Sequence, residues 1–205
     1  MTERNPASSA AFPLRTALRD GTPVVVRPVR PDDKHLLEVG MEHLSTQDRY
    51  FRFFRPIGKL SDTLLDRFTE IDHFDHEAIG AMDAGKAPSR PAGVARYIRI
   101  PSETTAAEVA VTVVPSHQGK GLGSLLLGVL ARRAVENGVR EFSAIVLEDN
   151  YRMLDVFGEL GFVREQIADG EIELRIPLFD DAALYPQTPV GDVFRQASAL
   201  LNASG

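Results

Sequence analysis

The residues best suited to chemistry in this chain form a glycine-rich segment, residues 118–124, which follows a β-branched run at 108–114. The run ends at Pro115, which cannot donate to a sheet ladder, and the apolar pattern after the glycines predicts a helix over 122–137. Consecutive N–H groups at such a helix start can converge on an anion, and glycines let a phosphate approach the backbone. The segment therefore predicts a pyrophosphate site, with a tight strand-to-helix turn as the simpler alternative.

The spacing of these glycines does not fit the two common phosphate-binding motifs. Ser124 stands where the third glycine of Gly-x-Gly-x-x-Gly would fall when counted from Gly121, and the pattern Gly-x-x-x-x-Gly-Lys is absent. A Rossmann site and a Walker site are therefore both disfavoured.

A closer match exists for residues 113–123, Val-Val-Pro-Ser-His-Gln-Gly-Lys-Gly-Leu-Gly. This segment closely resembles the acyl-CoA signature of the GNAT acetyltransferases, Gln/Arg-x-x-Gly-x-Gly/Ala after a strand. The residues that resemble the second half of that signature are Asn150, Phe157, Gly161 and Phe162. The likeness covers residues 22–178 and implies an α/β fold: a GNAT-like central sheet, mixed but mostly antiparallel, with flanking helices and a splayed cofactor-binding strand.

Residues 44–54 together with 107–110 look like the acetyltransferase domain of bacterial Pat-type protein lysine acetyltransferases. Those proteins commonly fuse this domain to a cyclic-nucleotide-binding module or to an acyl-CoA-synthetase-like region. The 205 residues leave no room for either, so regulation by such modules is not carried over to this chain. The resemblance implies protein lysine as the acceptor and an acyl-CoA synthetase as a protein partner.

The resemblance also implies which residues hold acetyl-CoA, the acetyl-donating co-substrate. Backbone groups near Val111 and Val113 would bond the pantetheine arm, because a splayed strand leaves ladder groups free. The other cofactor-binding residues would be Gln118, Gly119, Lys120, Gly121, Leu122, Gly123, Ser124, Asn150 and Phe157. Phe157 stands where many relatives place a tyrosine as the acid for the thiolate, so no residue is assigned as a dedicated acid.

Glu108 opens the β-branched run and is the candidate general base, because a glutamate at this point has that role in the families that the chain resembles. A lysine side chain has an unperturbed pKa of about 10.4, so roughly 4 kcal/mol opposes formation of the free amine at neutral pH. To act as the base, Glu108 needs burial that raises its pKa, or a water that relays the proton. The alternative is an ordinary solvent-facing strand residue.

We expect the amine to attack the acetyl group directly in a ternary complex. The chain has no cysteine and no Ser-His-Asp pattern that would favour a covalent acyl-enzyme. Protein lysine is the preferred acceptor. If the protein is an enzyme, the alternative acceptor is a small-molecule amine. The alternative from another functional class is a catalytically silent acyl-CoA sensor.

Composition disfavours several other functions. The 23 Lys and Arg residues against 29 Asp and Glu residues give a net charge of -6, which argues against a broad grip on nucleic acid. The absence of cysteine removes disulfides and thiolate metal sites. No signal peptide and no run of about 20 apolar residues is evident, so we expect no membrane association and a cytoplasmic location.

The cluster at 72–77, Asp-His-Phe-Asp-His-Glu, contains side chains that can bind metals. It lacks His-Glu-x-x-His and the inverted His-x-x-Glu-His pattern, so we expect no metal there. A polar loop between a helix and a strand is the interpretation, and its side chains could border the substrate entrance and tune Glu108 by charge.

Residues 45–54 predict a helix in which Phe51 and Phe54 share a core face. Arg49, Arg52 and Arg55 recur every three residues and predict a solvated polar face, with a CoA phosphate or an acidic partner as the alternative.

The chain divides into a flexible tail at 1–12, the acetyltransferase domain at 13–178, and a linker with an amphipathic helix at 179–205. This last helix, over 190–201, is expected either to dock on its own chain or to form a homodimer contact. The other expected helices cover 34–44, 61–69 and 150–160. The expected strands cover 24–29, 77–83, 93–100, 108–114, 141–147, a segment from 161, and 171–176.

Overall fold

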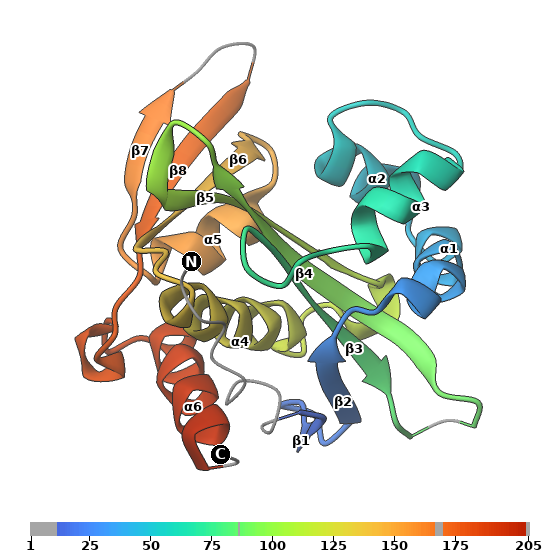
Figure 1. The fold of residues 1–205 in the computed structure, drawn as a ribbon, viewed down its shortest axis with the longest axis horizontal. Coiled ribbons are helices and arrows are strands. Elements are labelled where there is room, and N and C mark those ends of the chain that lie inside the picture. Colours follow the sequence, from blue (N-terminus) through green and yellow to red (C-terminus); the bar gives the residue numbers. More distant parts are fainter. Residues whose placement is uncertain (1–11, 86, 167–169, 204–205) are drawn as a thin grey trace.

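The computed structural model describes residues 12–85, 87–166 and 170–203, which form a single sheet flanked by α-helices (Figure 1). Its strands are β1 (Leu14–Ala17), β2 (Pro23–Pro28), β3 (His76–Asp83), β4 (Arg90–Ile100), β5 (Glu103–Val113), β6 (Glu141–Leu147), β7 (Val163–Gln166) and β8 (Glu171–Pro177). Its helices are α1 (Lys34–Glu42), α2 (Thr46–Phe53), α3 (Asp62–Thr69), α4 (Leu122–Glu136), α5 (Tyr151–Gly158) and α6 (Pro189–Ala203).

The strands are arranged in the order β1-β2-β3-β4-β5-β6-β8-β7. Within the described part of the chain, β5 and β6 are the one parallel pair, and the other neighbouring strands run antiparallel. The α4 crossover joins β5 to β6, as a parallel connection requires. The expectation of a mixed but mostly antiparallel sheet with flanking helices is confirmed.

The two faces of the sheet are covered differently. Alternate residues of β5, including Ala107 and Val109, point into a large core that contains the buried face of α4. The opposite face, which carries Arg96 and Thr112, lies under α1 and α3. Figure 1 shows α1, α2 and α3 gathered on one side of the long β3–β4–β5 strands, with α4 and α6 away from them. The sheet therefore separates two layers of helices.

The C-terminal helix docks on its own chain. Phe194 and Ala197 of α6 are 2% and 0% exposed and belong to the same core cluster as α4. The close approach occurs at Gly128 of α4, where a Cβ atom would lie 3.2 Å from both the Ala197 Cβ and the Phe194 Cα. A glycine at this position therefore lets the two helices pack closely.

Several sequence-based boundaries were wrong. The strand expected at 108–114 is β5, which begins at Glu103, so Glu108 lies in its interior rather than at its start. The strand β1 was missed, because its four residues, Leu-Arg-Thr-Ala, give too short a pattern. Of the tail at 1–12, residues 1–11 lie outside the described residues, while Phe12 packs against the core.

The core face expected for α2 was also wrong. Phe53 packs against a small cluster formed by Met41, Leu44 and Val114. Phe54 ends the helix in a left-handed conformation with φ 55°, so it leaves the helical periodicity. Ser45 begins the helix as expected, since its side chain accepts a hydrogen bond of 3.0 Å from the Asp48 N–H.

No helix in the described ranges is long and apolar enough to cross a membrane.

Candidate active site

The strands β5 and β6 part at Glu108. Their parallel register runs over three residue pairs and ends where Glu108 lies opposite Ser143. On its other edge β5 stays paired with β4 through Val113, and β6 stays paired with β8 through Leu147. Residues 109–113 therefore turn one backbone edge toward the opening between the strands, which is the splay that the resemblance to GNAT acetyltransferases implied.

Val111 and Val113 lie along this opening. Their side chains pack against the core on the α4 side of the sheet. What these two residues can offer to the opening is therefore their backbone groups. The Val113 carbonyl oxygen accepts a hydrogen bond of 3.0 Å from the Gln118 side chain, which ties the end of β5 to the glycine segment.

The glycine segment forms the turn into α4. Gly119 and Gly121 have φ values of +74° and +87°, in the left-handed region that favours glycine. Gly121 is the N-cap of α4, and its carbonyl accepts from the Leu125 N–H at 3.0 Å. No side chain caps this helix, so its first N–H groups are available to an anion.

Side chains around this turn leave the approach to the backbone open. Leu122 and Ser124 are buried, with exposed fractions of 1% and 6%. A Cβ atom at Gly119 would meet nothing within 4 Å, and one at Gly123 would make only an ordinary contact of 3.7 Å with Val113. The turn therefore presents mainly backbone N–H groups, which is the arrangement that binds a pyrophosphate.

The β1–β2 turn supplies charged groups beside the glycines. Lys120 is paired with Asp20, with Nζ and Oδ2 2.9 Å apart, and this contact holds the pKa of the Asp20 carboxyl well below its ordinary value. Arg19 donates its backbone N–H to the Lys120 carbonyl at 3.2 Å, and its side chain lies against Gly121. Sequence reasoning missed Arg19, because it lies a hundred residues away in the chain and belongs to no recognised motif.

Gln118 is held by three elements at once. Its side-chain amide donates to Asp48 of α2 at 2.8 Å and to the Val113 carbonyl, while its oxygen accepts from Arg152 of α5. The sequence placed Gln118 at the cofactor, but it gave no sign of Asp48 or Arg152. Both are ordinary helix-surface residues until the fold brings their helices together.

Asn150 and Phe157 occupy the helix after β6. The Asn150 side chain accepts a hydrogen bond of 3.3 Å from the Met153 N–H and thereby caps α5. Phe157 is 3% exposed and lies in the core cluster. The structure thus gives Asn150 a capping contact and Phe157 a packing contact.

Glu108 is exposed, on the face of β5 away from α4. Arg96 lies opposite Ala110, two residues further along β5, so Arg96 and Glu108 share this face. Arg52 of α2 is close enough for its charge to interact with the Glu108 carboxylate. The carboxylate therefore stands where the strands part, on the face of the sheet that carries α1, α2 and α3.

The polar cluster at 72–77 is part of the protein's framework. Glu77 is 0% exposed, and its carboxylate accepts from the Arg133 guanidinium at 2.9 and 3.1 Å and contacts His73 Nδ1 at 2.7 Å. Asp75 pairs with Arg99 at 2.7 Å. No group of three or more metal-binding side chains is arranged to hold an ion in the described residues.

Comparison with known proteins decides the family. Residues 42–162 match the model of the acetyltransferase (GNAT) family. The chain belongs to the GNAT acetyltransferase family. Its residues 42–162 contain the strand opening, the glycine turn and the helices α4 and α5, so the match covers the candidate site except for Arg19 and Asp20 of the β1–β2 turn.

The GNAT relatives include Pat enzymes. The chain is 34% identical to "Acetyltransferase Pat" of Mycolicibacterium smegmatis over 182 residues, 87% of this chain and 54% of the relative. It is 32% identical to an acetyltransferase of Pseudomonas aeruginosa over 77% of this chain and 84% of the relative. The solved GNAT domain of S. lividans PAT superimposes with a TM-score of 0.74 at 34% identity, covering 80% of this chain and 96% of that one. The chain therefore spans about half the length of the M. smegmatis protein.

GNAT enzymes are acetyl-CoA-dependent N-acetyltransferases, and the residues present here fit that co-substrate. The uncapped start of α4 suits the pyrophosphate, and the free edge of residues 109–113 suits the amide groups of the pantetheine arm. Acetyl-CoA, when bound, supplies a thioester-activated acetyl group. Glu108 then lies at the end of the opening that this arm would follow.

Proposed function

We propose that this GNAT enzyme acetylates the side-chain amine of protein lysines by direct attack, with Glu108 as the general base. The observation that carries the proposal is the position of Glu108. Its exposed carboxylate stands at the last residue pair of the β5–β6 ladder, where the strand edge opens. A base at this point meets an amine that arrives from the α2 side while the co-substrate follows residues 109–113.

The proton balance requires such a base. A lysine arrives as an ammonium ion at neutral pH and must lose one proton before its nitrogen can attack the thioester carbonyl. As the C–N bond forms the C–S bond would break, CoA would leave as its thiolate, and the second proton, from the new amide nitrogen, would go to that thiolate or to solvent. Of the two routes open to a glutamate base, the relay through one water fits Glu108, because its carboxylate is exposed to solvent at the point where the two strands part. The side chain at position 157 is a phenylalanine and has no proton to donate.

The acceptor is the part of the proposal that rests on resemblance. Pat enzymes of M. smegmatis and S. lividans are among the relatives at 34% identity, and their likeness includes the segment at 44–54 that forms α2. By the same resemblance, an acyl-CoA synthetase is the first candidate acceptor protein. A small-molecule amine and a silent acyl-CoA sensor are the competing outcomes of the test.

The test is site-resolved mass spectrometry of a bacterial lysate incubated with isotopically labelled acetyl-CoA and the enzyme. Wild type should label a discrete set of lysines, and Glu108→Gln should lower that labelling at least a hundredfold, as expected for loss of a general base. Glu38→Gln, which removes an exposed carboxylate from α1, is the control and should label like wild type.

Three results contradict the proposal in different ways. Equal labelling by wild type and Glu108→Gln would show that another group takes the proton. No labelled protein at all, with acetyl-CoA binding confirmed by calorimetry, would move the acceptor to small amines. A lack of turnover with any amine would favour the sensor.

A further inference from the structure

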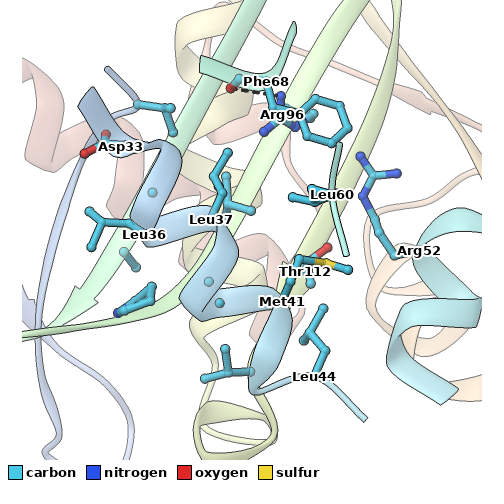
Figure 2. A pocket seen from close by; sticks show the side chains of 18 of the residues that line it. Asp33, Leu36, Leu37, Met41, Leu44, Arg52, Leu60, Phe68, Arg96 and Thr112 are labelled. Atoms are coloured by element: carbon cyan, nitrogen blue, oxygen red, sulfur yellow. Dashed lines mark hydrogen bonds between the residues drawn. The ribbon is translucent and has the colours of Figure 1, made fainter. Parts of the chain in front are cut away.

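A cavity of about 90 Å³ lies between the sheet and the helices α1, α2 and α3 (Figure 2). Its walls are mostly apolar and include Leu36, Leu37, Met41, Leu44 and Leu60. Figure 2 shows that two guanidinium groups, from Arg52 and Arg96, lie at one end, near the ring of Phe68. The cavity thus combines apolar walls with a cationic end.

Arg96 is a buried cation with neutral partners. It is 5% exposed, and its guanidinium donates to the Phe68 carbonyl at 3.3 Å and lies 3.2 Å from His76 Nε2. Burial lowers the pKa of His76 to about 4, so this imidazole is neutral and accepts the hydrogen bond. Burial, with the nearby charges of Arg52 and Arg67, lowers the pKa of Arg96 to about 9.

Arg52 comes to the same place from α2. Its guanidinium carbon lies 6.0 Å from the centre of the Phe68 ring, and that of Arg96 lies 4.1 Å from the same centre. Burial lowers the pKa of Arg52, while the charge of Glu108 raises it. Two like charges are therefore held around one aromatic ring.

The fold neutralises a third arginine of the same cavity. Both oxygens of Asp33 accept hydrogen bonds of 2.7 Å from Arg27, a bidentate pair. In the described residues no carboxylate forms an ion pair with Arg52 or Arg96. Buried guanidinium groups are normally paired, and a carboxylate is the planar anion that their donors fit. The missing negative charge points to a ligand.

We propose that Arg52 and Arg96 bind a carboxylate that the acceptor carries beside its reactive amine. This inference rests on the proposed function, because it describes the acceptor of that same site. Arg96 lies across from Ala110, two residues from Glu108 on one face, so the carboxylate and the amine would be bound roughly 7 Å apart. The side chain of an acidic residue next to a lysine and the carboxyl group of a free amino acid share this chemistry.

The experiment compares matched acceptors that differ in one charge. The first pair compares a lysine peptide that has Glu on either side of the lysine with the same peptide that has Gln there. The second pair compares free lysine with lysine amide. Wild type should use the carboxylate member of at least one pair about tenfold better in kcat/KM, mainly through KM, since a charge-assisted hydrogen bond is lost with the neutral member. The pair that shows the preference identifies the source of the carboxylate.

Variants assign the preference to the cavity. Arg52→Gln should remove the tenfold preference, because KM should rise about tenfold more for the charged acceptor than for the neutral acceptor. Arg55→Gln, which removes an exposed guanidinium just beyond α2, should keep the preference. Arg96→Lys keeps a charge but lacks the bidentate fork, so it should weaken the preference without abolishing it.

The outcomes separate this inference from the proposed function. Equal use of the charged and neutral members of both pairs by wild type would overturn the carboxylate site and leave lysine acetylation standing. An Arg52-dependent preference seen only with free lysine would support the site and contradict protein lysine as the acceptor. Equal losses of activity on charged and neutral acceptors in Arg52→Gln, with an unchanged melting temperature, would also overturn the site.

Discussion

The Asp48 carboxylate of α2 accepts a hydrogen bond of 2.8 Å from the side-chain amide of Gln118, seventy residues further along the chain. Asp48 also caps its own helix, since its carboxylate accepts from the Ser45 N–H at 3.2 Å. The same Gln118 amide donates to the Val113 carbonyl at the end of β5. One side chain therefore joins the helix that carries Arg52 to the glycine turn at the start of α4.

Removal of this junction should weaken the binding of acetyl-CoA. In Gln118→Ala the loop loses its hydrogen bonds to Asp48 and Val113, each worth about 1 kcal/mol net, and the turn becomes less ordered before binding. We expect Kd for acetyl-CoA, measured by isothermal titration calorimetry, to rise about five- to thirtyfold. Gln196→Ala, an exposed position on α6, is the control. An unchanged Kd in Gln118→Ala would mean that the backbone alone orders the turn.

Two glycines with nearly equal positive φ values allow strain to be separated from ligand binding. Gly121 and Gly138 have φ values of +87° and +84°, and alanine at either should cost about 1–2 kcal/mol of stability. A Cβ atom at Gly121 would also lie 3.2 Å from Arg19 Nε, whereas one at Gly138 would meet nothing within 4 Å. We expect similar drops in melting temperature and a raised Kd for acetyl-CoA in Gly121→Ala alone. Equal Kd values in the two variants would contradict an anion site at this turn.

Much of the fold could be predicted because local patterns agree with it. The strand at 141–147 matches the expected bounds, and the helix expected over 122–137 is α4, followed by Gly138 in a left-handed conformation. The start of β5 was placed too late because the residues before Glu108 are Thr-Thr-Ala-Ala, which have no apolar alternation. The local sequence therefore predicted which helices and strands form more accurately than it predicted where they begin and end.

The sequence predicted only the part of the candidate site that belongs to a recognised motif. The glycine turn could be identified because its function depends on backbone conformation, which glycine spacing reveals. The three-residue spacing of Arg49, Arg52 and Arg55 predicted one solvated face, but α2 ends at Phe53 and Arg52 turns toward the ring of Phe68. That contact joins two helices, and single-sequence periodicity contains no information about it.

A buried ion pair should dominate the acid sensitivity of the fold. The Glu77 carboxylate is 0% exposed; burial alone would raise its pKa, but the hydrogen bond from His73 and the charge of Arg133 outweigh burial and lower it. A lowered pKa in the folded state means that the stabilisation is present above the unfolded pKa, near 4.5, and is lost as pH falls through the folded value. The urea concentration at the midpoint of unfolding should therefore decrease as the pH is lowered below about 4.5.

Two variants compare this buried ion pair with an exposed ion pair. Glu77→Gln removes the fully buried carboxylate that faces Arg133 and leaves that guanidinium with the half-buried Glu136 alone, 3.2 Å away. The variant should cost about 3–5 kcal/mol at pH 7, and its stability should change less with pH in the acid range than that of wild type. Asp66→Asn removes the exposed partner of Lys34 and should cost no more than about 1 kcal/mol. Similar losses for both variants would show that the Glu77 network contributes little beyond a surface pair.

The contact between α4 and α6 can be tested with two helical glycines in different surroundings. Alanine in place of glycine within a helix normally stabilises by about 0.5–1 kcal/mol, and Gly40→Ala should do so because its Cβ atom would be 3.9 Å from Pro91. At Gly128 the new Cβ atom would lie 3.2 Å from the Phe194 Cα, so α6 must move outward, and we expect a net loss of about 1–3 kcal/mol. Chemical denaturation of both variants measures the difference. A gain in Gly128→Ala equal to that in Gly40→Ala would mean that α6 is held loosely on α4.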